Sequence, residues 1–294
     1  MNANSQALPI ARADARGAEA RRAATLVIAP PSRMPTLGLA ELWSYRGLFV
    51  FLVWRDVKVR YTQTVLGAAW ALLQPLLTMV VFSVVFGRLA RLPSDGVPYP
   101  VFALAALVPW AYFSAALSGA SNSLVAERNL ITKVYFPRLV VPLAPVLAGL
   151  VDLGIATLLL GAVMLGYGLV PGLAAIPGIP AMLLLMVLTV AGMGCWLAAL
   201  NLKYRDFRYV VPFLLQVWMY ASPIVYPASM VPERYRALYA LNPMAGVIEG
   251  MRAVLFGNPV PWSMLAVSAA VGVALFATGV LYFRYTERVF ADLV

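Results

Sequence analysis

The chain has 294 residues, of which 62% are hydrophobic and 12% are charged, with a mean hydropathy of +0.84 and a formal net charge of +10. This composition excludes an ordinary soluble domain and indicates an integral membrane protein. Histidine is absent, and the single cysteine, Cys195, lies in an apolar run, so neither a histidine-based catalytic site nor a thiolate zinc site is expected. The basic residues adjoin apolar segments, which favours a membrane over nucleic acid as partner.

The N-terminal segment, residues 1–35, is rich in arginine and contains only Asp14 and Glu19 as acidic residues. It has no apolar run of signal-peptide length, since Thr25–Ala29 is too short. We predict a disordered cytoplasmic tail. An acid-poor, arginine-rich start also fits an organellar transit peptide, and this alternative stays open.

Residues 36–62 predict an amphipathic interface helix that lies at the membrane surface. Its apolar run, Leu48–Trp54, is too short to cross a bilayer and is flanked by Arg46 and a basic segment. The charges fall on several faces, so an ordinary juxtamembrane helix is the alternative. The charged residues that we assign to this interface helix are Arg55, Asp56, Lys58 and Arg60.

Six apolar segments follow the interface helix. The first, Gly67–Gly87, is uncharged and covers roughly 30 Å as a helix, which is the thickness of the hydrocarbon core. We therefore predict an all-α integral membrane protein in which residues 63–294 form a six-span transmembrane domain. The other five predicted spans are near 100–122, 139–168, 177–200, 209–227 and 263–283.

The distribution of basic residues predicts the orientation. Of the 22 Lys and Arg, nine precede the first span, three follow the second, three follow the fourth and two follow the sixth, whereas five lie on the opposite side. Because basic loops remain in the cytoplasm, we expect both termini to be cytoplasmic.

Asp152 is the one formal charge inside a predicted span. An intramembrane carboxylate can relay protons, but no Lys, Arg or His lies in a predicted span to pair with it, so we favour an acid that is neutralised or hydrogen-bonded between helices. None of the lysines ends a G-x-x-x-x-G-K-[ST] phosphate loop. We therefore expect a transport protein and not an enzyme, with no catalytic residue, no metal and no cofactor held by this chain.

Aromatic and amide side chains share faces on two predicted spans. Trp70 and Gln74 are four residues apart in the first span, and Phe213, Gln216 and Tyr220 follow helical spacing in the fifth. Aromatic rings cover the apolar faces of sugars while amides bond hydroxyl groups, so both faces suit a sugar chain. Aromatic residues at membrane interfaces and amides that tie helices together are the alternative.

The connection between the fifth and sixth predicted spans has the pattern of two short helices. Pro232 can open the first, and Asn242-Pro243 supplies an N-cap and a first-turn proline for the second, which ends near Gly257. We expect these helices on the external side, where they dip into the membrane, cap a pore or pack on the bundle as a surface loop. Glu249 and Arg252 lie opposite the apolar face of the second helix. The residues that we single out in this connection are Asn242, Pro243, Glu249 and Arg252.

Five segments together resemble a known family. They are R-D-V-K-V-R-Y-T-Q-T-V-L-G-A-A-W-A-L-L-Q-P-L-L (55–77), E-R-N-L-I-T-K-V-Y-F-P-R (127–138), N-L-K-Y-R-D-F-R-Y (201–209), S-P-I-V-Y-P (222–227) and L-N-P-M-A-G-V-I-E-G-M-R (241–252). In this order, and over roughly residues 40–290, the chain resembles the permease subunit of type-2 ABC transporters that export polysaccharides such as O-antigen, capsule or teichoic acid.

The resemblance implies a homodimer in the bacterial inner membrane, docked on a separate cytosolic ATP-binding subunit that holds ATP and magnesium. It implies a lipid-linked polysaccharide as substrate and a channel lined by the first and fifth spans, with contributions from Trp70, Gln74, Phe213, Gln216 and Tyr220. It implies that residues 232–256 form an external gate, with Asn242, Pro243, Glu249 and Arg252 as gate residues. It also implies that the loop at 127–138 couples the channel to the ATPase. The coupling residues would be Glu127, Arg128, Lys133, Tyr135 and Arg138.

Two other functions remain open at this stage. A type-2 ABC permease for a drug or a small lipid would have the same topology but would not need the aromatic and amide faces. An ion-coupled secondary carrier would need no ATPase and would use a site such as Asp152, although the chain shows no convincing internal repeat. The resemblance gives Asp152 no role.

Overall fold

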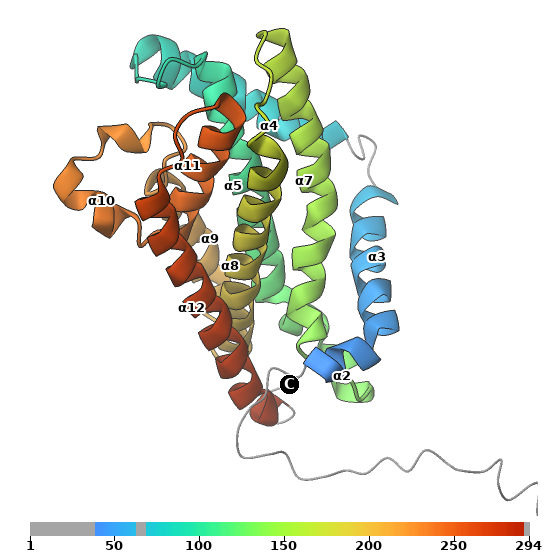
Figure 1. The fold of residues 1–294 in the computed structure, drawn as a ribbon. Coiled ribbons are helices and arrows are strands. Elements are labelled where there is room, and N and C mark those ends of the chain that lie inside the picture. Colours follow the sequence, from blue (N-terminus) through green and yellow to red (C-terminus); the bar gives the residue numbers. More distant parts are fainter. Residues whose placement is uncertain (1–38, 63–68, 291–294) are drawn as a thin grey trace, which may run out of the picture. The chain divides into compact units, whose positions relative to one another are not determined.

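The computed structural model describes residues 39–62 and 69–290, and the predicted tail at 1–35 lies outside them. The regular elements of the described part are all helices, which confirms the all-α prediction (Figure 1). In chain order they are α2 Leu39–Ser44, α3 Arg46–Thr62, α4 Ala69–Phe82, the π-helix η1 Ser83–Leu89, α5 Tyr99–Ala126, α6 Arg128–Lys133, α7 Val140–Gly166, α8 Ala175–Lys203, α9 Phe207–Tyr220, the 3-10 helix η2 Ala228–Met230, α10 Glu233–Tyr239, α11 Pro243–Phe256, α12 Trp262–Thr286 and the 3-10 helix η3 Glu287–Val289.

Five helices in the described residues are long and apolar enough to cross a membrane: α4 with η1, α5, α7, α8 and α12. They have 21 to 29 residues and coincide with the first, second, third, fourth and sixth predicted spans. The fifth predicted span, 209–227, is shorter than expected. There α9 has 14 residues, about 21 Å of helix, and ends at Tyr220 before a turn that contains Pro223 and Pro227. A sixth span therefore stays a prediction.

The centre of the bundle is formed by α5 and α8. Helix α5 packs against α7 and α8, and α8 packs closely against α12. At the crossing of α8 and α12, Gly192 and Gly279 bring the two backbones together, because a Cβ at Gly279 would collide with the carbonyl oxygen of Gly192. Small residues at such crossings let membrane helices approach closely. The crossing thus depends on these two glycines.

The bundle has two ends, which we name after the elements they carry. At the loop end α5, α8 and α12 finish, α7 begins, and residues 127–138 connect α5 to α7. There the Asn201 side-chain amide of α8 donates to the Ser121 carbonyl of α5 at 2.9 Å. The opposite end, the α11 end, carries α10, α11 and the start of α5.

Helix α3 lies alongside the first half of α7 (Figure 1). Leu52 is its buried residue and packs against Val140 and Ala144 near the start of α7. Large apolar side chains, among them Trp43 of α2 and Trp54 of α3, are exposed on the outside. The predicted interface helix therefore forms, but it packs lengthwise against α7. Its place at a membrane surface stays a prediction.

Candidate functional site

The aromatic and amide face predicted on α4, which consists of Trp70 and Gln74, borders a cavity of about 490 Å³ between α4, α5 and α7. Trp70 is half exposed and Gln74 is exposed, and both line this cavity. The end of α3 contributes as well, so four helices meet around the space. Its polar and aromatic lining residues are Arg60, Tyr61, Trp70, Gln74, Tyr112 and Asp152.

The predicted α9 face points away from the core of the chain. Phe213, Gln216 and Tyr220 are all exposed, whereas Val211 and Leu215 are buried on the opposite side of the helix. Helix α9 packs against α5 and α8, and α4 packs against α5 and α7. One chain therefore does not join the two faces into a single wall, and a path that combines them stays a prediction.

Asp152 has partners that the sequence argument missed. The Arg60 guanidinium forms an ion pair with its carboxylate, and the Tyr61 hydroxyl donates a hydrogen bond to it. Both partners come from α3, which lies outside the predicted spans in which we looked for a counter-ion. No basic residue lies inside a predicted span, but Asp152 has a basic partner because the charged helix α3 packs against α7. The expectation that it is hydrogen-bonded between helices is met.

The loop at 127–138 is tied to α3 by one of its predicted coupling residues. Glu127 connects α5 to α6, and its carboxylate lies 2.7 Å from the Arg55 guanidinium, which also contacts Asp56 at 2.8 Å. Partial burial acts to lower the pKa of Arg55, but hydrogen bonds from its guanidinium to Glu127 and Asp56 outweigh this and raise it. Lys58, which lies in the same helix, is exposed.

The other predicted coupling residues differ in their surroundings. Arg138 is held by Glu287, because its backbone N–H donates to the carboxylate at 3.1 Å and its guanidinium donates to the carbonyl at 2.9 Å. Arg128, Lys133 and Tyr135 are exposed, with Tyr135 at 79%. The loop is thus held at its two ends and by the buried Ile131, while Arg128, Lys133 and Tyr135 are exposed.

The predicted N-cap of the second gate helix is present at the α11 end. The Asn242 side-chain oxygen accepts from the Met244 backbone N–H at 3.0 Å, and Pro243 occupies the first turn. The same oxygen accepts from the Trp218 indole at 2.8 Å, and the amide nitrogen donates to the Ser222 hydroxyl at 2.9 Å. Asn242 therefore joins α11 to α9 and to the turn that follows α9.

Arg252 corrects the prediction of a polar outer face on α11. Its side chain is buried, and its five N–H groups donate to the Glu249 carboxylate at 3.0 Å and to the carbonyl oxygens of Phe102, Pro223 and Ile224 at 2.7 to 3.3 Å. The guanidinium also lies 3.4 Å from the centroid of the Phe102 ring. Burial lowers the pKa of Arg252 to about 10, so it remains a cation at neutral pH. It ties α11 to α5 and to the turn after α9.

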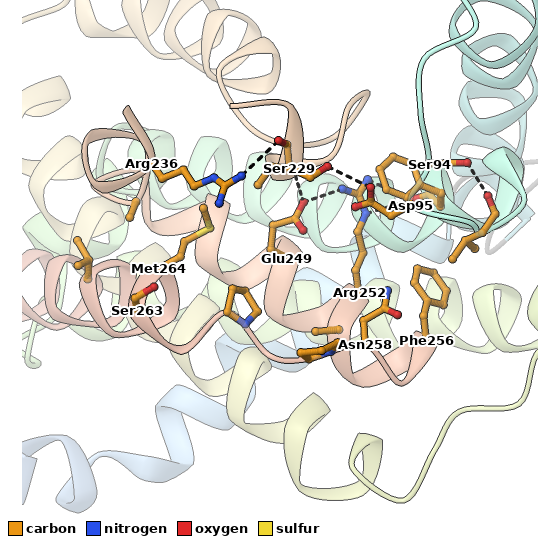
Figure 2. A pocket seen from close by; sticks show the side chains of 18 of the residues that line it. Ser94, Asp95, Ser229, Arg236, Glu249, Arg252, Phe256, Asn258, Ser263 and Met264 are labelled. Carbon is orange, nitrogen blue, oxygen red and sulfur yellow. Dashed lines mark hydrogen bonds and ion pairs between the residues drawn. The ribbon is translucent and has the colours of Figure 1, made fainter. Parts of the chain in front are cut away.

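A second cavity, of about 410 Å³, lies at the α11 end (Figure 2). The Ser229 hydroxyl donates to Asp95 at 3.0 Å across it, and Arg236 donates to the Ser229 carbonyl at 3.4 Å. Glu249 and Asn258 also line it. No sequence pattern indicated this cavity, because its lining residues come from the separate stretches 94–102, 228–240 and 249–267.

The family model for ABC-2 type transporters matches residues 47–256, a range that includes the α4 and α9 faces, the 127–138 loop and α11. The chain belongs to the ABC-2 type transporter family. It is thus a multi-pass membrane component of a transporter, and the predicted family resemblance is confirmed.

Three relatives match most of this ABC-2 transporter chain. The O-antigen export system permease protein RfbA of Myxococcus xanthus is 32% identical over 258 residues, which cover 86% of this chain and 98% of the relative. The RfbA protein of Klebsiella pneumoniae is 27% identical over 247 residues, 84% of this chain and 95% of the relative. The polysialic acid transport protein KpsM of Escherichia coli is 26% identical over 239 residues, 76% of this chain and 90% of the relative.

Proposed function

We propose that this protein is the channel-forming permease subunit of an ATP-driven exporter of lipid-linked polysaccharide across the bacterial inner membrane. The observation that carries the proposal is the near full-length relation to RfbA of Myxococcus xanthus, together with the relation to KpsM, whose name refers to a different polysaccharide. Two differently named polysaccharide transporters among the relatives favour a sugar polymer over a drug or a small lipid.

The geometry supports a path made by two copies of the chain. In one chain the α4–η1 helix is largely uncovered, with Trp70, Leu77 and Val81 exposed, and the aromatic and amide face of α9 is exposed as well. A second copy would bury apolar surface along these helices and enclose Phe213, Gln216 and Tyr220 between the subunits. Uncharged amides and rings along such a path would let a hydrophilic polymer slide without strong binding at one point.

The energy would come from a separate cytosolic subunit that binds ATP and magnesium. In the orientation predicted from the basic residues, both termini and the loop end face the cytoplasm. There the exposed side chains of the 127–138 loop would contact the ATPase. The α11 end would face the exterior, with Asn242, Pro243, Glu249 and Arg252 in the helix that closes the path. Membrane lipids would surround the exposed apolar side chains of α3.

The experiment that tests the proposal is purification of the chain from its native membrane in a mild detergent, with mass spectrometry of the bound proteins, followed by transport assays in vesicles. A stoichiometric subunit with a phosphate-loop motif, and polysaccharide export that requires ATP, would support the exporter. A chain that purifies alone and transports without ATP would contradict it. If in addition Asp152→Asn abolished transport while the 127–138 loop tolerated charge reversal, an ion-coupled carrier would replace it.

A further inference from the structure

Helix α3 carries two ion pairs that end on different elements. Arg55 contacts Glu127 at the start of the 127–138 loop, and Arg60 contacts Asp152 in α7. The two arginines are five residues apart, which is about 7.5 Å along a helix. Because both arginines belong to one helix, α3 links Glu127 to Asp152 through two successive ion pairs.

The second ion pair lies at the cavity that the predicted path residues border. Arg60, Tyr61 and Asp152 line this cavity together with Trp70 and Gln74. The side chains of Arg60 and Asp152 are 39% and 27% exposed, so the pair faces open space instead of being enclosed by packing. A contact that is open to the cavity on one side suits a pair that changes during a transport cycle.

The depth of Asp152 argues against an incidental surface contact. It lies twelve residues after the start of α7, about 18 Å along the helix, in a segment that is otherwise apolar. A carboxylate at such a position is costly unless it is paired, and Arg60 and Tyr61 supply the pairing from α3. Helix α3 therefore supplies the polar partners that α7 needs at the depth of Asp152.

We propose that Asp152 is a positioning residue, which holds Arg60 and Tyr61 at the wall of this cavity and passes displacement of the 127–138 loop through α3 to the region of Trp70 and Gln74. The inference rests on the proposed function, because it requires an ATPase that moves the loop. It assigns to Asp152 a mechanical role in place of proton transfer.

The test uses a cysteine reporter in the cavity wall. Ala71 lines the cavity on α4, and Cys195 is fully buried, so Ala71→Cys gives one accessible thiol among the described residues. We would measure the rate of its reaction with a small neutral thiol reagent, in the full complex with its ATPase, with and without magnesium and a non-hydrolysable ATP analogue. The analogue is expected to change the rate in the parent protein. Asp152→Asn is expected to abolish this change and to lower the amount of polysaccharide exported per ATP hydrolysed.

Three further variants separate positioning from simple stability. The exchange Arg60→Asp with Asp152→Arg is expected to restore the nucleotide response, and Tyr61→Phe, which removes one hydroxyl, is expected to weaken it without affecting folding. Glu233→Gln is the matched control, because it breaks the exposed Arg236–Glu233 pair at the α11 end, where the atoms are 3.7 Å apart. This control is expected to keep the full response.

The outcomes distinguish this inference from the proposed function. If the parent complex exports no polysaccharide with ATP, the proposed function fails and the inference fails with it. If the parent exports polysaccharide but Asp152→Asn and Tyr61→Phe both keep its nucleotide response and its export per ATP, the inference alone is overturned. A loss in Asp152→Asn that the charge exchange reverses would support it.

Discussion

The helices α11 and α3 are similar in length but are held in opposite ways. Of the 14 residues of α11, 12 are buried, whereas Leu52 is the one buried residue that α3 contributes among its 17. Helix α11 is enclosed by α5, α8 and α12, while α3 rests on α7 along one side. The chain therefore has one end that is built into the core and one helix that is attached to the outside of the bundle.

The cations of the two helices show the same difference. All five N–H groups of Arg252 are used, and its side chain is 4% exposed. The side chains of Arg55 and Arg60 are 34% and 39% exposed, and each reaches a carboxylate on another helix or loop. A buried cation is costly to remove, whereas a partly exposed pair such as Arg55–Glu127 contributes little stability. We infer that the α11 end is rigid and that α3 is the part that can move.

The largest effect on stability is expected for Arg252→Leu. The substitution leaves Glu249 without its cationic partner and the carbonyl oxygens of Phe102 and Pro223 without these donors, so we expect a loss of about 3–5 kcal/mol in the free energy of unfolding. Thermal unfolding in detergent measures it. Arg236→Leu is the control at the same end, because Arg236 is exposed and should cost about 1 kcal/mol or less. Equal losses for the two variants would show that the α11 end is not rigid.

The next effect is expected at the crossing of α8 and α12. Gly192→Ala places a methyl group against the backbone of Leu275 and Phe276, which cannot yield as a flexible side chain can, and we expect a loss of about 1–3 kcal/mol. Gly161→Ala in α7 is the matched control, since no atom lies within 4 Å of its added Cβ. That control should be neutral or should stabilise the helix by about 0.5–1 kcal/mol. Similar unfolding temperatures for both variants would contradict the close crossing.

A smaller loss is expected for Asn242→Ala. It removes the N-cap of α11 and the acceptor of the Trp218 indole, so we expect a loss of about 1–2 kcal/mol. Asn242→Asp separates the two halves of the side chain, because it keeps the acceptor oxygens but removes the donors to Ala221 and Ser222. Its loss should be the smaller of the two, as measured by the same unfolding assay. If the aspartate variant were as unstable as the alanine variant, the donors would matter more than the cap.

Local signals in the sequence were sufficient for much of the fold. The apolar composition of each stretch predicts the five long helices. The starts and ends of the shorter helices follow from a few neighbouring residues, namely Pro232 before α10, Asn242-Pro243 at the start of α11 and Gly257 after its end. Such features depend on neighbouring backbone groups, which is why spacing predicts them.

The corrections arise where distant segments meet. Glu249 and Arg252 fall opposite the apolar stripe of α11, so helical spacing predicted an exposed face, but Arg252 binds Phe102, which is 150 residues away in the chain. Arg60, the partner of Asp152, lies 92 residues earlier in the chain and outside the predicted spans, so helical spacing does not connect the two. The end of α9 was placed too late because the turn after Tyr220 is itself apolar. Periodicity gives no information about such pairings.

The smallest effect on stability is expected at the Arg55–Glu127 pair. Because both side chains are partly exposed, Arg55→Ala or Glu127→Ala should change the free energy of unfolding by about 0–1 kcal/mol, and less at high salt. Because the pKa of Arg55 is raised in the folded state, its stabilising contribution is fully present below the ordinary pKa of arginine and is lost only as the pH rises through the raised value. This contribution should therefore be constant between about pH 6 and pH 9. Unfolding at two ionic strengths and several pH values checks both points.

The same pair should matter far more for transport than for stability. If α3 passes the movement of the loop to the cavity, either alanine variant should lower the polysaccharide exported per ATP hydrolysed while the protein stays folded. The exchange Arg55→Glu with Glu127→Arg should recover export, because it rebuilds the pair with reversed charges. Normal export by the alanine variants of the Arg55–Glu127 pair would mean that α3 only attaches to the bundle and transmits no movement. In that case Arg252→Leu should lower export only under conditions that unfold the protein. A loss of export at an unchanged free energy of unfolding would instead show that α3 takes part in the transport cycle.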